Sequence, residues 1–150
     1  MAIYALTGDD QIIINQVPLN DFPDGDIGTL SIQNTIAEMT TGKDANTIFA
    51  LNEAGKNAVL TVRVLMGSSD DKRLNGLIPQ TSKFASYLLV EGSIIKQIGD
   101  GAGNISYNTY MLSGGMVNKL PDVKINVNGD GQQAVVEYQI MFALASRAIQ

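Results

Sequence analysis

The chain has 150 residues, 15 acidic and 10 basic side chains, a formal net charge of −5, and neither cysteine nor histidine. The missing side chains exclude disulfides, thiol nucleophiles, histidine-based triads and zinc sites with thiolate or imidazole ligands. An acidic chain without a basic stripe is also a poor ligand for nucleic-acid phosphates. Its hydrophobic content of 45% predicts one globular domain over residues 1–150. No apolar run approaches the ~20 residues that span a bilayer, and no secretory signal is visible, so we expect synthesis in a cytoplasm.

The N-terminal part of the chain reads as strands and turns. Asp10–Val17 is a β-branched run that predicts a strand, and Asp21–Gly28 is dense in residues that reverse the chain. The residues that follow alternate, with Leu30 and Ile32 on one face. The other face of this strand is small, polar and uncharged: Thr29, Ser31, Gln33 and Thr35.

A hairpin finger is predicted over Ile36–Asn57. Residues 36–42 would lead up, residues 43–46 would turn, residues 47–51 would return, and residues 52–57 would make a second turn. A structureless insert of this length is uncommon in a compact domain. Three of the finger's side chains, Ile48, Phe49 and Leu51, are too apolar for a free arm in solvent, so we expect it to pack on something, and a neighbouring subunit is a good candidate.

The stretch Ala58–Met66 predicts a strand that is apolar on nearly both faces. One face consists of Ala58, Leu60, Val62, Val64 and Met66, and the other of Val59, Thr61, Arg63 and Leu65. A chain of this size has few elements with which to cover both faces. The arrangement therefore raises the question of what covers the second one.

A helix is predicted directly afterwards, over residues 69–79. Ser68 or Ser69 can cap it, and Asp70 and Asp71 favour its positive N-terminal end. Its apolar stripe would be Leu74, Leu77 and Ile78, its outward side chains Asp71, Lys72 and Asn75, and its terminator Pro79.

The C-terminal half continues the β pattern. Phe84–Val90 fits a strand or a buried helix, Gly99–Asn104 is a turn, and Ile105–Met111 alternates as a strand. Val123, Ile125 and Val127 alternate with polar residues before a turn at 128–132. In the last strand one face is Val136, Tyr138, Ile140, Phe142 and Leu144. The fold class is mainly β with one clear helix.

Three patterns could carry chemistry, and each has a simpler structural explanation. Asn126, Asn128, Asp130, Gly131 and Glu137 match the spacing of a calcium loop, but the first ligand is Asn and the flanks have strand periodicity. A hairpin turn is therefore favoured there. The alternate glycines of residues 99–104 lack the Gly-Lys-Ser/Thr of a phosphate loop, so a β-turn is favoured over a phosphate site.

The third pattern is paired carboxylates: Asp9/Asp10, Asp24/Asp26 and Asp70/Asp71. All lie in predicted turns or a helix cap, where aspartate is favoured for backbone reasons, so we interpret them as solvated residues. Arg63 is interpreted as a paired or outward-facing side chain. No constellation supports catalysis, and we expect no enzyme activity, no cofactor and no metal.

Three stretches together resemble a known family. They are the strand and helix of Asn57–Ile78, the Lys-x-Pro-Asp passage within Gly114–Asn126, and the protruding hairpin Thr40–Gly55. In order and spacing they are similar to the tail-tube proteins of contractile-tailed bacteriophages, specifically a family of short tube proteins related in fold to the type VI secretion tube protein. The likeness covers most of the chain and is weakest at the N-terminus.

The resemblance implies two packed antiparallel sheets, as a β-sandwich or barrel, with a flanking helix and a protruding hairpin. It implies hexameric rings that stack into the hollow inner tube of the tail, with strands of neighbouring subunits covering the faces that one chain cannot. Tail sheath and baseplate proteins would be partners, and DNA would pass through without specific binding. The chain would be a virion component of the tail, assembled in the cytoplasm of a host bacterium.

Site residues follow as hypotheses on this resemblance. Contacts between subunits are expected at Thr41, Lys43, Ile48, Phe49 and Leu51. The lumen is expected to be faced by Thr29, Ser31, Gln33 and Thr35. The alternatives left open are the tube of a phage-like bacteriocin or secretion device, a ligand-binding β-barrel with an internal apolar pocket, and a carboxylate-dependent hydrolase.

Overall fold

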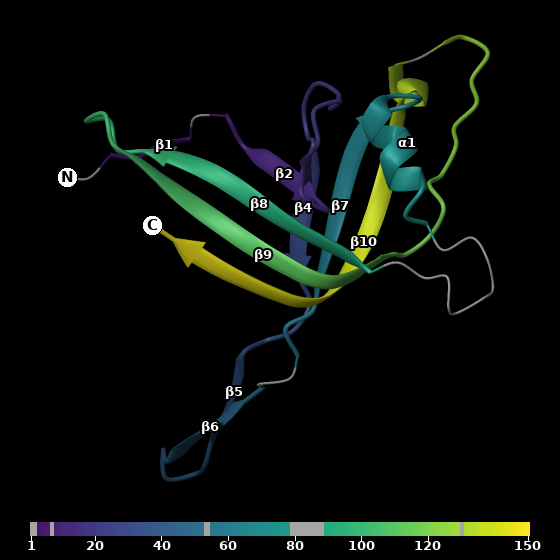
Figure 1. Ribbon diagram of the computed structural model, residues 1–150. Coiled ribbons are helices and arrows are strands. Elements are labelled where there is room, and N and C mark those ends of the chain that lie inside the picture. Colours follow the sequence, from purple (N-terminus) through teal and green to yellow (C-terminus); the bar gives the residue numbers. More distant parts are fainter. Residues whose placement is uncertain (1–2, 7, 53–54, 79–88, 130) are drawn as a thin grey trace.

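The computed structural model describes residues 3–6, 8–52, 55–78, 89–129 and 131–150 (Figure 1). Its strands are β1 Ala5–Leu6, β2 Gln11–Ile14, β3 Val17–Pro18, β4 Gly28–Ile32, β5 Ala37–Thr41, β6 Thr47–Leu51, β7 Ala58–Leu65, β8 Val90–Gly99, β9 Ile105–Val117 and β10 Val135–Ile149. The α-helix of the described part is α1, Ser69–Asn75, and a short 3₁₀ helix spans Gly131–Ala134.

Two sheets are formed, and all of their pairings are antiparallel. The larger has eight strands in the order β3-β2-β8-β9-β10-β7-β4, with β1 also paired to β8. The smaller consists of β5 and β6 alone. The mainly β fold with one flanking helix and a protruding hairpin is thus confirmed. The hairpin extends away from the body at the opposite end from α1 (Figure 1).

The large sheet forms two layers because β9 and β10 bend sharply (Figure 1). One layer contains β4, β7 and the first half of β10, and the other contains β2, β8, most of β9 and the second half of β10. The buried face changes sides at the bend. Up to Phe142 the even-numbered residues of β10 are buried, whereas beyond it Leu144 is exposed and Ala145 packs against the core.

Glycines make the bend possible. Gly114 has a φ of +65°, a conformation that L side chains rarely adopt. A Cβ on Gly115 would lie 2.5 Å and 2.6 Å from two ring carbons of Phe142 and 2.9 Å from the carbonyl oxygen of Val90. The ring therefore sits where any larger residue at position 115 would place its side chain. Close approach of this kind is a usual reason for glycine within a strand.

The core fills the space between the two layers. From β7 it takes the even-numbered residues, each at most 1% exposed, as predicted; Met66 lies beyond the strand and is exposed, so that part of the prediction is wrong. From β10 it takes the predicted face except Leu144. The second layer contributes Ile12, Ile14 and Leu112.

Several predicted boundaries differ from the structure. Asp10–Val17 is not one strand, because the chain reverses at Asn15 and Gln16, whose φ values of 50° and 68° form a two-residue turn between β2 and β3. The helix ends at Asn75 instead of 79, and Leu77 and Ile78 follow it in turns that still pack against the core. Pro79 and Phe84–Leu88 lie outside the described residues. Val90 begins β8.

The strand predicted around Val123–Val127 is wrong, and so is the hairpin at 128–132. Residues 118–126 have no strand assignment, and a turn closed by the Gly129 amide and the Asn126 carbonyl (3.3 Å) leads into the 3₁₀ helix. The residues have strand propensity, but in this chain they run outside the sheet (Figure 1).

Candidate assembly surfaces

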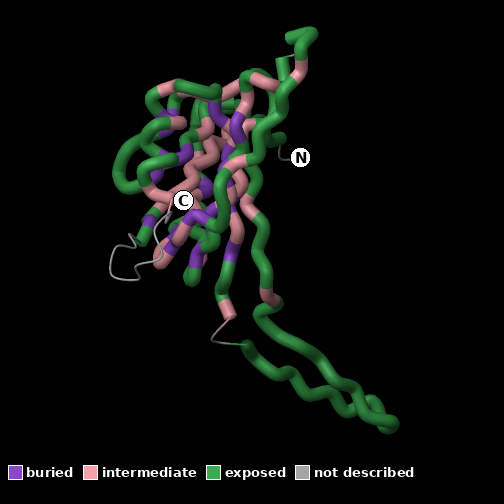
Figure 2. Tube along the Cα trace, turned by 90° about the vertical axis from the view of Figure 1, so that its right-hand side faces the viewer, coloured by how far each residue is buried: buried purple, intermediate pink, exposed green. Residues whose placement is uncertain are grey.

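The β5–β6 hairpin is a ladder of five residue pairs, and no described residues form a second layer over it. Its register runs from Ala37 opposite Leu51 to Thr41 opposite Thr47, and the amide of Gly42 donates to the carbonyl of Asn46 at 2.8 Å across the turn. All ten strand residues are exposed, which Figure 2 shows as an unbroken exposed arm. The prediction of a hairpin in this segment is confirmed.

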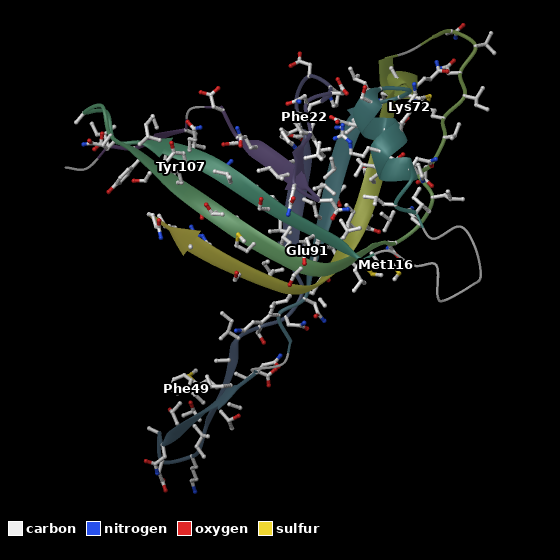
Figure 3. The ribbon with its side chains drawn as sticks, viewed as in Figure 1. Phe22, Phe49, Lys72, Glu91, Tyr107 and Met116 are labelled. Carbon is white, nitrogen blue, oxygen red and sulfur yellow. The ribbon has the colours of Figure 1, made fainter. Side chains whose placement is uncertain are left out.

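Large apolar side chains gather on this arm. Met39 and Phe49 are directly opposite each other and share a face with Leu51, while Ile48 points to the other face. Phe49 is 66% exposed and Ile48 74%, and Figure 3 shows Phe49 far from the body of the protein. An isolated two-stranded hairpin is marginally stable in water, and contiguous exposed apolar patches are typical of interaction sites in general.

The predicted contact residues all belong to this arm. Thr41 and Thr47 place their hydroxyl oxygens 3.2 Å apart, and Lys43 lies in the turn. Thr41, Lys43, Ile48, Phe49 and Leu51 are all exposed. Contacts between subunits at these residues stay a prediction.

The predicted lumen residues lie along the terminal strand β4 and just beyond it. Thr29 pairs with Thr61 and Ser31 with Val59, on the outer face of the first layer. The side-chain amide of Gln33 donates to the hydroxyl of Ser31 at 3.1 Å. Thr29, Ser31, Gln33 and Thr35 are all exposed. The same face carries Arg63, which is half-buried and lies opposite Glu137 in the register. That the four predicted residues face a lumen stays a prediction.

The loop between β9 and β10 is an exposed apolar surface that the sequence interpretation missed. Val123 is 68% and Ile125 88% exposed, with Leu120 and Val127 also exposed. The sequence interpretation treated the segment as one more strand of the sheet and did not identify this surface. The alternation of apolar and polar residues in this segment was the available signal, because a strand outside the sheet needs a partner elsewhere.

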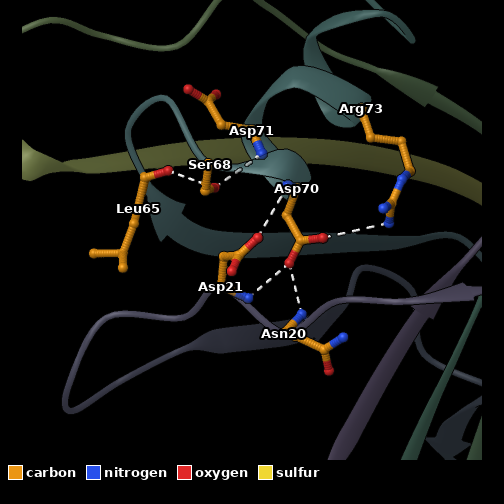
Figure 4. Close-up of polar contacts among 7 residues, drawn as sticks. All are labelled: Asn20, Asp21, Leu65, Ser68, Asp70, Asp71 and Arg73. Atoms are coloured by element: carbon orange, nitrogen blue, oxygen red, sulfur yellow. Dashed lines mark hydrogen bonds and ion pairs between the residues drawn. The ribbon is translucent and has the colours of Figure 1, made fainter.

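Helix α1 is fixed by a buried carboxylate (Figure 4). One oxygen of Asp70 accepts the amides of Asn20 (2.6 Å) and Asp21 (2.7 Å), and the other accepts Arg73 at 3.3 Å. Asp70 is 2% exposed, so its interpretation as a solvated residue is wrong. Burial of a carboxylate is tolerated because hydrogen bonds and an ion pair compensate it. The predicted cap is confirmed at Ser68, whose hydroxyl accepts the Asp71 amide at 3.2 Å.

A second contact joins α1 to the sheet. The hydroxyl of Tyr138 donates to the carboxylate of Asp71, which also accepts the amide of Gly67 at 2.8 Å. Asp71 is therefore half-buried and bonded, not directed into solvent as predicted, whereas Lys72 and Asn75 are exposed. Burial, and then the bond to Asp71, raise the pKa of Tyr138 above its ordinary value.

The other predicted acidic residues lie in loops and turns of the described part of the chain. Asp10 forms an ion pair with Lys96 at 2.9 Å, while Asp24 and Asp26 are exposed in the loop before β4. Asp100 closes the β8–β9 turn, where its carboxylate accepts the amide of Ala102 at 2.8 Å. This hydrogen bond is the largest of the causes that lower the pKa of Asp100 below its ordinary value. Within the described ranges, no cluster of three or more acidic, histidine or cysteine side chains is arranged to hold a metal.

The described residues of the calcium-loop pattern lie in different elements. Asn126 and Asn128 lie in the exposed turn, Gly131 starts the 3₁₀ helix, and Glu137 lies within β10. Asp130 lies outside the described residues. Among described helices, none has the length and apolar character to cross a membrane.

Surface hollows are present beside the hairpin root and along the sheet. One of them, of about 480 Å³, is lined by residues of the hairpin root, β9 and β10, including Ile36, Lys56, Tyr110 and Arg147. The guanidinium of Arg147 lies 5.7 Å from the ring centroid of Tyr110, and its Nε donates to Asn108 at 2.9 Å. A cation–aromatic contact and a buried amide thus order this wall of the hollow.

No family model and no curated protein sequence matches the chain. Solved structures do match. A chain of the PVC sheath–tube complex of an extracellular contractile injection system, in the extended state, gives a TM-score of 0.59 at 12% identity, covering 94% of this chain and 87% of that one. The PVC sheath/tube terminator gives 0.56 at 12%, covering 96% and 94%. The tube-terminating cap of the anti-feeding prophage gives 0.60 at 10%, covering 96% and 89%. At these identities the likeness establishes the fold alone, and that fold is tail-tube-like.

Proposed function

We propose that this chain is a structural, non-enzymatic subunit that polymerises as stacked hexameric rings into the inner tube of a contractile phage tail, the conduit for DNA ejection. The observation that carries the proposal is the exposed hairpin, whose apolar side chains meet no second layer within the described part of the chain. The tail-tube-like fold gives that surface a context, because tubes are built from repeated contacts between copies.

In the assembled tube the hairpin contacts a neighbouring subunit through Thr41, Lys43, Ile48, Phe49 and Leu51. Thr29, Ser31, Gln33 and Thr35 face the lumen, where small uncharged groups let DNA pass without holding it. Sheath and baseplate proteins are the outer and terminal partners. The tube forms in the cytoplasm of the host bacterium and becomes part of the virion.

The test compares three proteins by size-exclusion chromatography and negative-stain electron microscopy. Wild type forms rings or tubes as its concentration rises. The variant Ile48→Ser/Phe49→Ser/Leu51→Ser stays monomeric with unchanged circular dichroism, because it removes apolar area only from the exposed arm. The matched control Ile48→Val/Phe49→Leu/Leu51→Met keeps the arm apolar and still assembles.

Two results would contradict the proposal. A wild-type protein that stays monomeric at every concentration would overturn the tube function. Tubes formed equally well by the serine variant would overturn the role of the hairpin.

The second candidate is the tube of a phage-like injection or secretion device. It is favoured by the origin of the three neighbours, which come from extracellular contractile injection systems and an anti-feeding prophage. The genes that flank this one separate the two: adjacent capsid genes support the phage tail, and sheath genes without capsid genes support the device.

A further inference from the structure

The loop segment Asp122–Asn126 has the side-chain pattern of a strand without belonging to the sheet. Val123 and Ile125 are mostly exposed, and they alternate with Lys124, whose ammonium donates to the side-chain amide oxygen of Gln132 at 2.9 Å. The segment and the hairpin lie at opposite ends of the molecule (Figure 1). A contact between them in one copy is therefore out of reach.

The hairpin offers an open edge at β5. Hydrogen bonds join Ile36 with Asn52 and Gly42 with Asn46, and pairing alternates along an antiparallel ladder. Glu38 and Thr40 therefore bond to β6, whereas the amides and carbonyls of Ala37, Met39 and Thr41 point away from it. An edge of this kind is a template for another strand.

We propose that Asp122–Asn126 of one copy adds to the β5 edge of a second copy as an antiparallel third strand. The inference rests on the proposed tube function, because it names the surfaces through which copies associate. In the register that we assign, Val123 lies opposite Met39, Lys124 opposite Glu38, and Ile125 opposite Ala37. Val123 and Ile125 then bond through their main chains, and the Asn126 amide keeps its bond to the Gln133 side chain.

Side-chain chemistry selects this register. Val123 and Ile125 join the face that holds Met39, Phe49 and Leu51, so that three strands share one apolar surface. On the other face, Lys124 meets the opposite charge of Glu38. A slip of one residue would turn both apolar side chains to the Glu38 face, and a slip of two would place Lys124 opposite Thr40, which carries no charge.

The contact is also repeatable. Because it joins two different surfaces at opposite ends of the molecule, each added copy presents the same free surface again. Repetition of such a head-to-tail contact builds a ring or an extended stack, and the proposed tube needs contacts of this kind.

Engineered cysteines test the register directly, since the chain contains none of its own. Met39→Cys and Val123→Cys proteins are mixed under assembly conditions, oxidised, and separated on a non-reducing gel. Residues directly opposite in an antiparallel pair have the spacing of a disulfide, so a covalent dimer is expected. The matched control mixes Glu38→Cys with Val123→Cys, whose side chains would lie on opposite faces, and loss of the dimer band is expected.

Charge reversal gives an independent readout. Glu38→Lys or Lys124→Glu alone should raise the concentration needed for assembly by roughly two- to fivefold, the range of a cross-strand ion pair. The double variant with both reversals should restore it. Suppose that wild type forms tubes, that the Met39→Cys and Val123→Cys proteins give no crosslink, and that the charge reversals do not change assembly. That result would overturn this contact and leave the tube function standing. A wild-type protein that never associates would overturn both.

Discussion

Strands β6 and β7 carry similar side chains and end in opposite environments. The four core residues of β7 are at most 1% exposed, whereas every residue of β6 is exposed. The difference is in their neighbours. β7 lies between β10 and β4 and faces a second layer, whereas among the described strands β6 pairs with β5 alone. Whether an apolar residue is buried thus depends on the elements around it as well as on its hydrophobicity. An apolar strand outside the core remains available to another molecule.

The largest expected effect contrasts these two strands directly. Leu60→Ala should lower the free energy of unfolding by about 2–5 kcal/mol, because it opens a cavity between the two layers. Phe49→Ala should change that of the monomer by less than ~0.5 kcal/mol, since the ring has no contact with the core. Urea unfolding of dilute monomer measures both. A Phe49→Ala loss as large as that of Leu60→Ala would mean that the arm is part of the folded body.

An intermediate effect concerns the bend that creates the second layer. Gly115→Ala should cost about 1–3 kcal/mol, because the new methyl group meets the Phe142 ring and the Val90 carbonyl. Gly131→Ala is the matched control: a Cβ there meets nothing within 4 Å and its φ is not in the left-handed region. Thermal unfolding of the two variants measures the difference in their melting temperatures. Equal melting temperatures would show that the ring is not held against position 115.

The smallest effect concerns the attachment of α1. Tyr138→Phe should cost roughly 1 kcal/mol near neutral pH by removing the hydrogen bond to Asp71. In the folded protein the pKa of Tyr138 is raised above its ordinary value of 10.0. The folded state therefore keeps a proton that the unfolded state releases, and the contribution is present below pH 10 and lost as the pH rises above it. Stability curves from pH 8 to 11 should converge for wild type and variant, and parallel curves would contradict the assignment.

Periodicity predicts the regular part of this fold. β7 and most of β10 follow from strict alternation, because both strands bury one face against the opposite layer. The hairpin follows from turn residues between two apolar runs, and Ser68 follows from its place before the acidic first turn of α1. These features depend on residues near one another in the chain.

Local sequence patterns do not show which residues pair with partners far away in the chain. The burial of Asp70 depends on amides 49 and 50 residues away, so its local pattern shows only a helix cap. The segment around Val123 has strand propensity, but propensity does not supply a partner. The reversal at Asn15 and Gln16 was missed because β-branched residues on both sides read as one run. For the assembly surfaces, composition identified the apolar arm, and only the structure placed it opposite the exposed loop.

Because β9 and β10 run unbroken through the bend, the two layers are one covalent and hydrogen-bonded fabric. A pulling force applied to either layer passes to the other along the polypeptide itself. Separating the layers therefore requires breaking ladders of main-chain hydrogen bonds as well as exposing apolar surfaces. The bend between the layers thus resists separation through covalent bonds and main-chain hydrogen bonds, whereas the β5–β6 hairpin is connected to this body only through its own two chain segments.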